Sequence, residues 1–175
     1  MTRILGIDPG SRLTGYGIIE MQRGRPCWVA SGCIRMAAEP LPERLRTIFQ
    51  GISTLLDEYL PTEVAIESVF MHRNPDSALK LGQARGAAIT AVTMQDIVVS
   101  EYAPSEIKRA VVGRGNASKQ QVQHMVTTLL ALSATPQADA ADALAVAVCH
   151  GHNNFGLGAL QQGTGRMARR RGRFR

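Results

Sequence analysis

The chain has 175 residues, of which 45% are hydrophobic and 19% are charged, which is enough for one compact domain with a substantial core. No apolar run reaches the roughly 18 residues of a membrane span, and the first residues lack the pattern of a secretory signal, so we expect a cytoplasmic protein. The three cysteines have no C-x-x-C spacing and are odd in number, which argues against a structural zinc site and against a disulfide framework.

The amino-terminal part of the chain predicts a three-stranded meander. Residues 4–8 form a short apolar strand, and a Pro-Gly turn leads into two further strands over residues 13–20 and 27–36. Apolar residues then recur at three- and four-residue steps over residues 41–59. This spacing predicts a helix that is ended by Pro61.

The rest of the chain alternates strands with helices. Residues 63–68 and 97–100 are predicted strands, separated by a helix over residues 74–95. Three more helices are predicted, over residues 104–112, after the capping residue Ser118, and over about 139–150. The sequence CHGH from Cys149 could suggest a metal cluster, but we interpret it as a helix end with incidental histidines. We therefore expect an α/β domain in which a five-stranded mixed sheet is flanked by helices.

The positive charge of the chain is concentrated at its carboxyl end. The net charge is +6, yet residues 1–150 hold equal numbers of basic and acidic side chains, and six arginines beyond them supply the excess. Residues 153–175 are rich in Gly, Gln and Arg, so we expect a folded domain over residues 1–152 followed by a flexible basic tail. Such a tail either binds phosphates without sequence preference or keeps the chain soluble.

Four carboxylates adjoin apolar runs of the sequence. Asp8 ends the first predicted strand, Glu67 lies at the end of the fourth, and Asp139 and Asp142 open the last helix. An ionised carboxylate in apolar surroundings is costly unless it is paired, hydrogen-bonded or bound to a metal ion. Asp139 and Asp142 share one helix face, and the predicted topology allows all four acids to converge. Such a cluster offers the hard oxygen ligands that Mg²⁺ prefers, which indicates a two-metal nuclease centre.

Each of these acids also has a structural interpretation. Asp139 and Asp142 favour the positive end of a helix dipole whether or not they bind a metal. Glu67 could be an ordinary acid at a strand end. Asp8 could order the Pro-Gly turn that follows it through its side chain.

Four segments of the chain carry a recognisable set of motifs. They are, in order, ILGIDPGSRLTGYG from Ile4, AIESVFMHRNPDSALKLGQARGAA from Ala65, VVGRGNASKQQVQHM from Val111 and PQADAADALAVAVCH from Pro136. Together they resemble the RuvC family of bacterial Holliday-junction resolvases, within the ribonuclease H-like fold. The resemblance spans nearly all of residues 1–152, which are therefore expected to form a ribonuclease H-like nuclease domain, and it does not extend into the tail.

The resemblance implies a homodimeric, Mg²⁺-dependent endonuclease of DNA recombination and repair. Such an enzyme nicks two opposed strands of a four-way junction and leaves 5′-phosphate and 3′-hydroxyl ends. It implies two Mg²⁺ ions per subunit, with Mn²⁺ able to substitute, and an association with the branch-migration proteins RuvA and RuvB. The catalytic, metal-binding acids of the family match Asp8, Glu67, Asp139 and Asp142.

The resemblance also implies three residues that bind DNA. Lys108 and Lys119 are expected near the scissile phosphate, and Phe70 is expected to stack on an unpaired base near the crossover. The sequence alone leaves simpler roles open. Phe70 could belong to the core, and Lys119 could be a solvated lysine in the first turn of a helix.

Two glycines in the predicted helix over residues 74–95 have a bearing on assembly. Gly82 and Gly86 are four residues apart, so they share one face and allow another backbone to approach closely. Their intrinsic cost in a helix implies that some packing demand offsets them. That demand is either the chain's own sheet or, as the resemblance suggests, a dimer interface.

Two other classes of function remain as alternatives. The sequence GIDPG followed by a glycine-containing strand also resembles the phosphate-binding hairpin of actin-like and sugar-kinase-type phosphotransferases, but the chain is short for two lobes and lacks a Walker sequence. A non-catalytic DNA-binding module with an arginine-rich tail is the second alternative. It leaves four acids that face a polyanion without explanation.

Overall fold

Three antiparallel strands form the first part of the sheet, and they are β1 (Thr2–Asp8), β2 (Leu13–Gln22) and β3 (Arg25–Arg35). The computed structural model describes residues 1–68 and 74–165 of the chain. Arg23 and Gly24, between β2 and β3, have φ angles of 52° and 81°, as a tight two-residue hairpin turn requires. The predicted meander is therefore confirmed.

Two parallel strands complete the sheet, whose order is β3-β2-β1-β4-β5. β4 (Glu63–Glu67) pairs with β1, and β5 (Val99–Tyr102) pairs with β4. The sequence predicts the fifth strand over residues 97–100, but its pairing begins at Val99, because Val99 lies opposite Val64 whereas Val98 is exposed. The crossovers between parallel strands contain the helices α1 (Leu41–Tyr59) and α2 (Pro75–Thr93).

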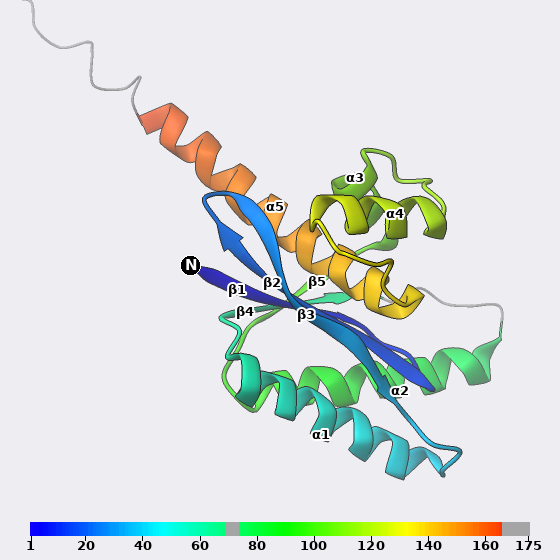
Figure 1. Ribbon diagram of the computed structural model, residues 1–175. Coiled ribbons are helices and arrows are strands. Elements are labelled where there is room, and N and C mark those ends of the chain that lie inside the picture. Colours follow the sequence, from blue (N-terminus) through cyan, green and yellow to red (C-terminus); the bar gives the residue numbers. More distant parts are fainter. Residues whose placement is uncertain (69–73, 166–175) are drawn as a thin grey trace, which may run out of the picture.

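Helices cover both faces of the sheet (Figure 1). α1 and α2 pack on one face, and α5 (Ala138–Gly165) crosses the other, with α3 (Pro104–Val112) and α4 (Lys119–Leu129) packed against it. Because both faces are covered, the run from Ile4 to Ile7 in β1 is buried without interruption. The expected five-stranded mixed sheet flanked by helices is confirmed.

The last helix is longer than its sequence pattern predicts. Apolar periodicity ends it near His150, whereas α5 continues to Gly165. One turn beyond His150, Asn154 donates a hydrogen bond of 2.8 Å to Glu63 of β4, so polar contacts hold this part of the helix where apolar spacing gives no signal.

The expected division into residues 1–152 and a tail over 153–175 stays a prediction, because the structure describes the chain only as far as Gly165. α5 crosses the expected boundary as one continuous helix. Among the helices that the structure describes, none is both long enough and apolar enough to cross a lipid bilayer.

Candidate active site

Glycines in β1 and β2 allow α5 to lie directly on the sheet. A Cβ atom on Gly6 would overlap a backbone carbonyl oxygen of α5, and one on Gly15 would overlap the carbonyl oxygen of Asp139. On Gly17, a Cβ atom would come within 2.7 Å of the backbone of Leu144. The helix backbone can approach the strands this closely only because these side chains are absent.

The ends of two strands meet the first turn of α5. Asp8 and Glu67 are the last residues of β1 and β4, which are parallel neighbours, so both acids lie at the same edge of the sheet. On the other side of β1, Asp8 pairs with Gly15, the residue on which the Asp139 turn rests. The four predicted acids are therefore gathered at one end of the sheet.

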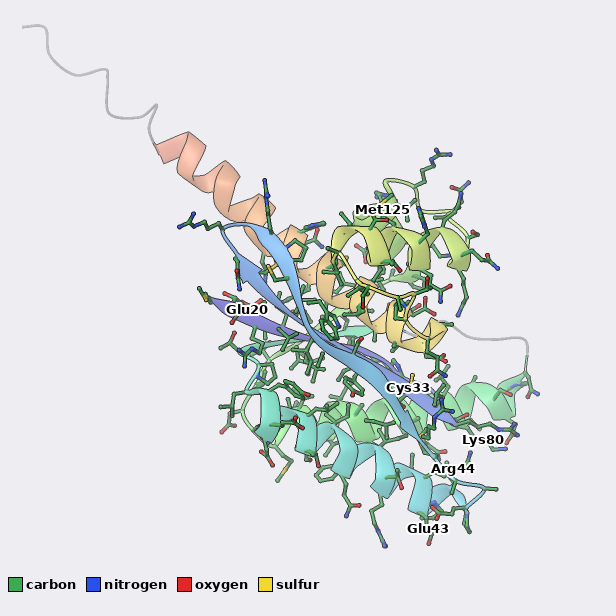
Figure 2. The ribbon with its side chains drawn as sticks, in the orientation of Figure 1. Glu20, Cys33, Glu43, Arg44, Lys80 and Met125 are labelled. Atoms are coloured by element: carbon green, nitrogen blue, oxygen red, sulfur yellow. The ribbon has the colours of Figure 1, made fainter. Side chains whose placement is uncertain are left out.

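A cavity of about 320 Å³ opens at this edge. Its charged lining residues are Asp8, Glu67, Asp142, Lys108 and Lys119. Asp139 lies outside the lining, although its charge acts on Asp8 and on Cys33 of β3, which is labelled in Figure 2. The structure thus brings three of the predicted acids together with both predicted lysines and leaves the fourth acid beside them.

Two acids of this cavity, Asp8 and Glu67, have a raised pKa. Desolvation, followed by the charges of Glu67 and Asp142, raises the pKa of Asp8 from 3.8 to about 8. Desolvation and the charge of Asp142 likewise raise the pKa of Glu67. The charge of Lys119 opposes both shifts, and that of Lys108 opposes the second. A carboxylate cluster with raised pKa values is a place where further positive charge would be stabilising.

Lys119 reaches the cavity from the amino end of α4. Ser118 caps this helix through a reciprocal pair of hydrogen bonds with Gln121, which confirms the predicted capping box. Nζ of Lys119 donates a hydrogen bond of 2.9 Å to Oδ2 of Asp142, and this bond raises the pKa of the lysine. Lys108 comes from α3, which ends at Gly113 as the sequence predicts.

The cavity has side chains of the type that bind a metal ion, but the oxygens of its described residues are not arranged closely enough to coordinate one. Within residues 1–68 and 74–165, no three His, Cys, Asp or Glu side chains are close enough together to hold one ion. Asp8 and Glu67 are nonetheless desolvated carboxyl groups, and burial is the largest cause of their raised pKa values. Such hard, unneutralised oxygens are the ligands that Mg²⁺ and Mn²⁺ take.

Two other predicted features have different outcomes. Phe70 falls outside the described residues, so its predicted role stays a prediction. Gly82 and Gly86 are exposed, and a Cβ atom on either would meet nothing within 4 Å among the described residues outside the helix's own backbone. Packing on the chain's own sheet, one of the two roles considered for these glycines, is therefore wrong.

Sequence reasoning missed a polar network at the opposite end of β4. His150 is 4% exposed, and its Nε2 lies 2.6 Å from Oε2 of Glu63 while its Nδ1 lies 2.9 Å from the Tyr102 hydroxyl. Asn154 contacts the same Glu63 oxygen. The helix-end interpretation of the CHGH sequence is wrong on this point, since His150 is an internal anchor of α5. The available signal was the four-residue spacing of His150 and Asn154, which places both polar side chains on one face of a helix.

Comparison with known proteins gives the family of the chain. The family model described as "Crossover junction endodeoxyribonuclease RuvC" matches residues 4–150. The chain belongs to the RuvC family. RuvC of Shewanella sp. (strain MR-4) is 57% identical over 176 residues, which cover 100% of both chains. RuvC of Hahella chejuensis (strain KCTC 2396) is 59% identical over 157 residues, which cover 90% of this chain and 91% of the relative.

Two solved structures share the architecture of this member of the RuvC family. T. thermophilus RuvC in complex with Holliday junction substrate superposes with a TM-score of 0.82 at 30% identity, covering 88% of this chain and 95% of that one. The yeast mitochondrial Holliday junction resolvase Ydc2 has a TM-score of 0.66 at 13% identity, covering 86% and 78% of the two chains, and supports the fold alone. The ribonuclease H-like fold implied by the family resemblance is confirmed.

Proposed function

We propose that this RuvC family member resolves Holliday junctions in DNA recombination and repair, and that the cavity at the carboxyl ends of β1 and β4 is its hydrolytic centre. The chain is a crossover junction endodeoxyribonuclease by family membership. The observation that carries the assignment of the site is the convergence of Asp8, Glu67 and Asp142, from three separate elements, on one cavity that also contains two lysines.

Asp8, Glu67 and Asp142 would hold divalent cations, with Asp139 joining from the adjacent helix turn. The expected cofactor is Mg²⁺, two ions per subunit, with Mn²⁺ as a substitute. When bound, such ions activate the attacking water and stabilise the leaving oxygen of an in-line displacement. The carboxylates would fix the positions of the ions, and the product ends would be a 5′-phosphate and a 3′-hydroxyl.

The two lysines of the cavity would bind the DNA backbone. Lys108 and Lys119 line the same space as the acids, so a phosphate that enters would meet their positive charge beside the reaction centre. Phe70 follows Glu67 closely in sequence and is proposed to stack on an unpaired base.

We propose a homodimer that uses the outer face of α2. Leu79 is 67% exposed, and Gly82 and Gly86 are exposed on the same helix with open space around them. Exposed helix glycines, which carry no side chain, allow a second helix to approach closely. Two symmetric active sites suit a junction with two equivalent scissile bonds. A Gly82→Gln variant should shift the dimer toward monomer in sedimentation measurements, and a wild-type chain that stays monomeric at working concentrations contradicts the assignment.

Association with RuvA and RuvB, and a cytoplasmic location, are proposed from family membership.

The decisive experiment offers the protein three labelled substrates: a four-way junction, a matching linear duplex and an RNA/DNA hybrid. Each is incubated with Mg²⁺ or with chelator. Paired, ligatable nicks confined to the junction and dependent on metal support the proposal. Cleavage of the hybrid would overturn the substrate but keep the chemistry, and junction binding without cleavage would favour a non-catalytic module.

Two variants connect the result to the site. Asp8→Asn should abolish cleavage while leaving junction binding largely intact. Asp96→Asn is the matched control, because Asp96 is exposed, lies outside the cavity and has a φ of 58° that asparagine tolerates. Loss of cleavage in both variants would mean that the assay reports on folding rather than on the proposed site.

A further inference from the structure

One acid of the cavity already has a cationic partner. Oδ2 of Asp142 lies 2.9 Å from Nζ of Lys119. The side chain of Asp142 is 18% exposed, whereas that of Lys119 is 74% exposed. The carboxylate is thus fixed in the wall of the cavity, while most of its partner lies in solvent.

The backbone of Lys119 is fixed, but its ammonium group is free to move. The capping box of Ser118 and Gln121 holds the first turn of α4, and the side chain of Val122, which follows Gln121, is buried. A lysine carries its charge on a flexible four-carbon stem. Since an exposed ion pair adds little stability, Nζ can leave Asp142 without disturbing α4.

A divalent cation in the cavity would require the same oxygen that Lys119 occupies. Asp142 lines the cavity together with Asp8 and Glu67, so a cation shared among these acids meets the ammonium group at Oδ2. Two positive charges at one carboxylate oxygen repel each other. The lysine therefore has to move toward the open side of the cavity, where the DNA backbone is expected.

We propose that Lys119 is an exchangeable counter-ion: it pairs with Asp142 while the cavity holds no cation, and binding of a divalent cation by Asp142 releases its ammonium group to a DNA phosphate. This inference rests on the proposed function, since it takes the carboxylates as cation ligands. Lys119 then opposes cation binding in the free protein and favours DNA binding once the cation is present. By linkage, the cation should strengthen the contribution of Lys119 to DNA affinity.

Lys108 provides the internal comparison. It lines the same cavity from α3 and carries the same charge, but in the described part of the chain it forms no ion pair with Asp142. Removing either lysine makes the cavity more negative in general. Only the removal of Lys119 also frees the Asp142 oxygen, so the difference between the two variants isolates the exchange.

The first test measures Mn²⁺ binding to the DNA-free protein by titration calorimetry. Lys119→Met should bind Mn²⁺ roughly 1.5-fold to fivefold more tightly than wild type, in keeping with the loss of a surface ion pair. Lys119→Arg, which can still pair with Asp142, should remain close to wild type, and Lys108→Met should change less than Lys119→Met. Equal gains in the two methionine variants would overturn the inference.

The second test measures junction affinity by fluorescence anisotropy, with Ca²⁺ or with chelator. Lys119→Met should lose more affinity in Ca²⁺ than in chelator, whereas an equal loss under both conditions would contradict release of the lysine. The proposed function fails in a distinguishable way. If wild type shows no saturable Mn²⁺ binding and Asp142→Asn is unchanged, the carboxylates are not cation ligands at all.

Discussion

Each end of β4 carries an acid that faces α5, but the two acids have opposite electrostatic surroundings. At one end, Glu63 contacts His150 and Asn154 of α5, so its carboxylate is held by two polar partners. At the other end, Glu67 faces the acids of the cavity, and desolvation together with Asp142 raises its pKa. Glu63, whose carboxylate has hydrogen-bond partners, fixes the helix on the sheet. Glu67 lies among other acids, so a cationic ligand would be stabilised beside it.

The largest expected effect tests the end of β4 that carries Glu67. Asp8→Asn should lower junction cleavage by more than about 100-fold, because residues that only orient a metal ligand already contribute about 10- to 100-fold. Its folding should be intact, since burial and the neighbouring acids already disfavour the charged form of Asp8, which the neutral amide of asparagine replaces. Single-turnover cleavage and thermal unfolding check the two parts. An unfolded Asp8→Asn protein would mean that Asp8 is structural.

Without metal, the stability of the protein should depend on pH through the raised pKa of Asp8. In the folded protein Asp8 keeps its proton up to about pH 8, whereas the unfolded chain releases it near 3.8. Folding therefore takes up a proton between these values, and stability should fall by roughly a few kcal/mol as the pH rises through that window. Urea unfolding in chelator measures the slope. Asp8→Asn should flatten it, and an identical slope in both proteins would refute the assignment.

The end of β4 that carries Glu63 should respond in stability rather than in chemistry. His150→Ala removes the buried partner of Glu63 and Tyr102, although Asn154 still contacts Glu63, and should lower the free energy of unfolding by about 1 to 3 kcal/mol. Cleavage per folded molecule should change little. His124→Ala, at an exposed position on α4, is the matched control and should stay within about 0.5 kcal/mol of wild type. A large loss of cleavage at unchanged stability would show that His150 belongs to the chemistry.

Gly15→Ala should disturb the contact that places the helix acids. Its methyl group would overlap the carbonyl oxygen of Asp139, so the first turn of α5 must shift away from Asp8. We expect a loss of about 1 to 3 kcal/mol in stability, as for other overpacked sites, and a larger loss in cleavage rate. Urea unfolding and single-turnover rates on the same preparation separate the two effects. Wild-type cleavage would show that the close approach is dispensable.

The smallest expected effect concerns Gly86, where an added Cβ atom would meet no other side chain or element of the described residues. Gly86→Ala should raise the stability of the protomer by up to about 1 kcal/mol through helix propensity alone. Urea unfolding at a dilution where the protein is monomeric checks this. A marked destabilisation would reveal a packing demand within the protomer that the contacts around Gly86 do not show.

Local signals in the sequence predict most of the fold. Gly113 ends α3 as expected because its left-handed conformation suits glycine, and Ser118 caps α4 because its hydroxyl reaches the third helical amide. The extension of α5 to Gly165 was not predictable in the same way. Its first turn beyond His150 contacts Glu63, which lies 91 residues before Asn154 in sequence, and a contact of that range leaves no periodicity.

In the candidate site, too, local features could be predicted from the sequence and features that depend on long-range packing could not. Asp8, Glu67 and Asp142 could be predicted because each adjoins an apolar run, where a charge needs a reason. The position of Asp139 outside the cavity lining could not, because it depends on how α5 is rotated on Gly15. The ion pair between Lys119 and Asp142 depends on the packing of α4 beside α5, which residue spacing does not specify.

The close approach of α5 to Gly6, Gly15 and Gly17 limits how this centre can be transplanted. A design that copies the acids and lysines onto another strand-helix scaffold would keep the donor atoms but not the missing Cβ atoms that let the helix descend. With ordinary side chains on those strands, the helix backbone would stand further from the sheet, and its acids would miss the strand acids. The smallest portable unit is therefore the hairpin of β1 and β2 together with the start of α5.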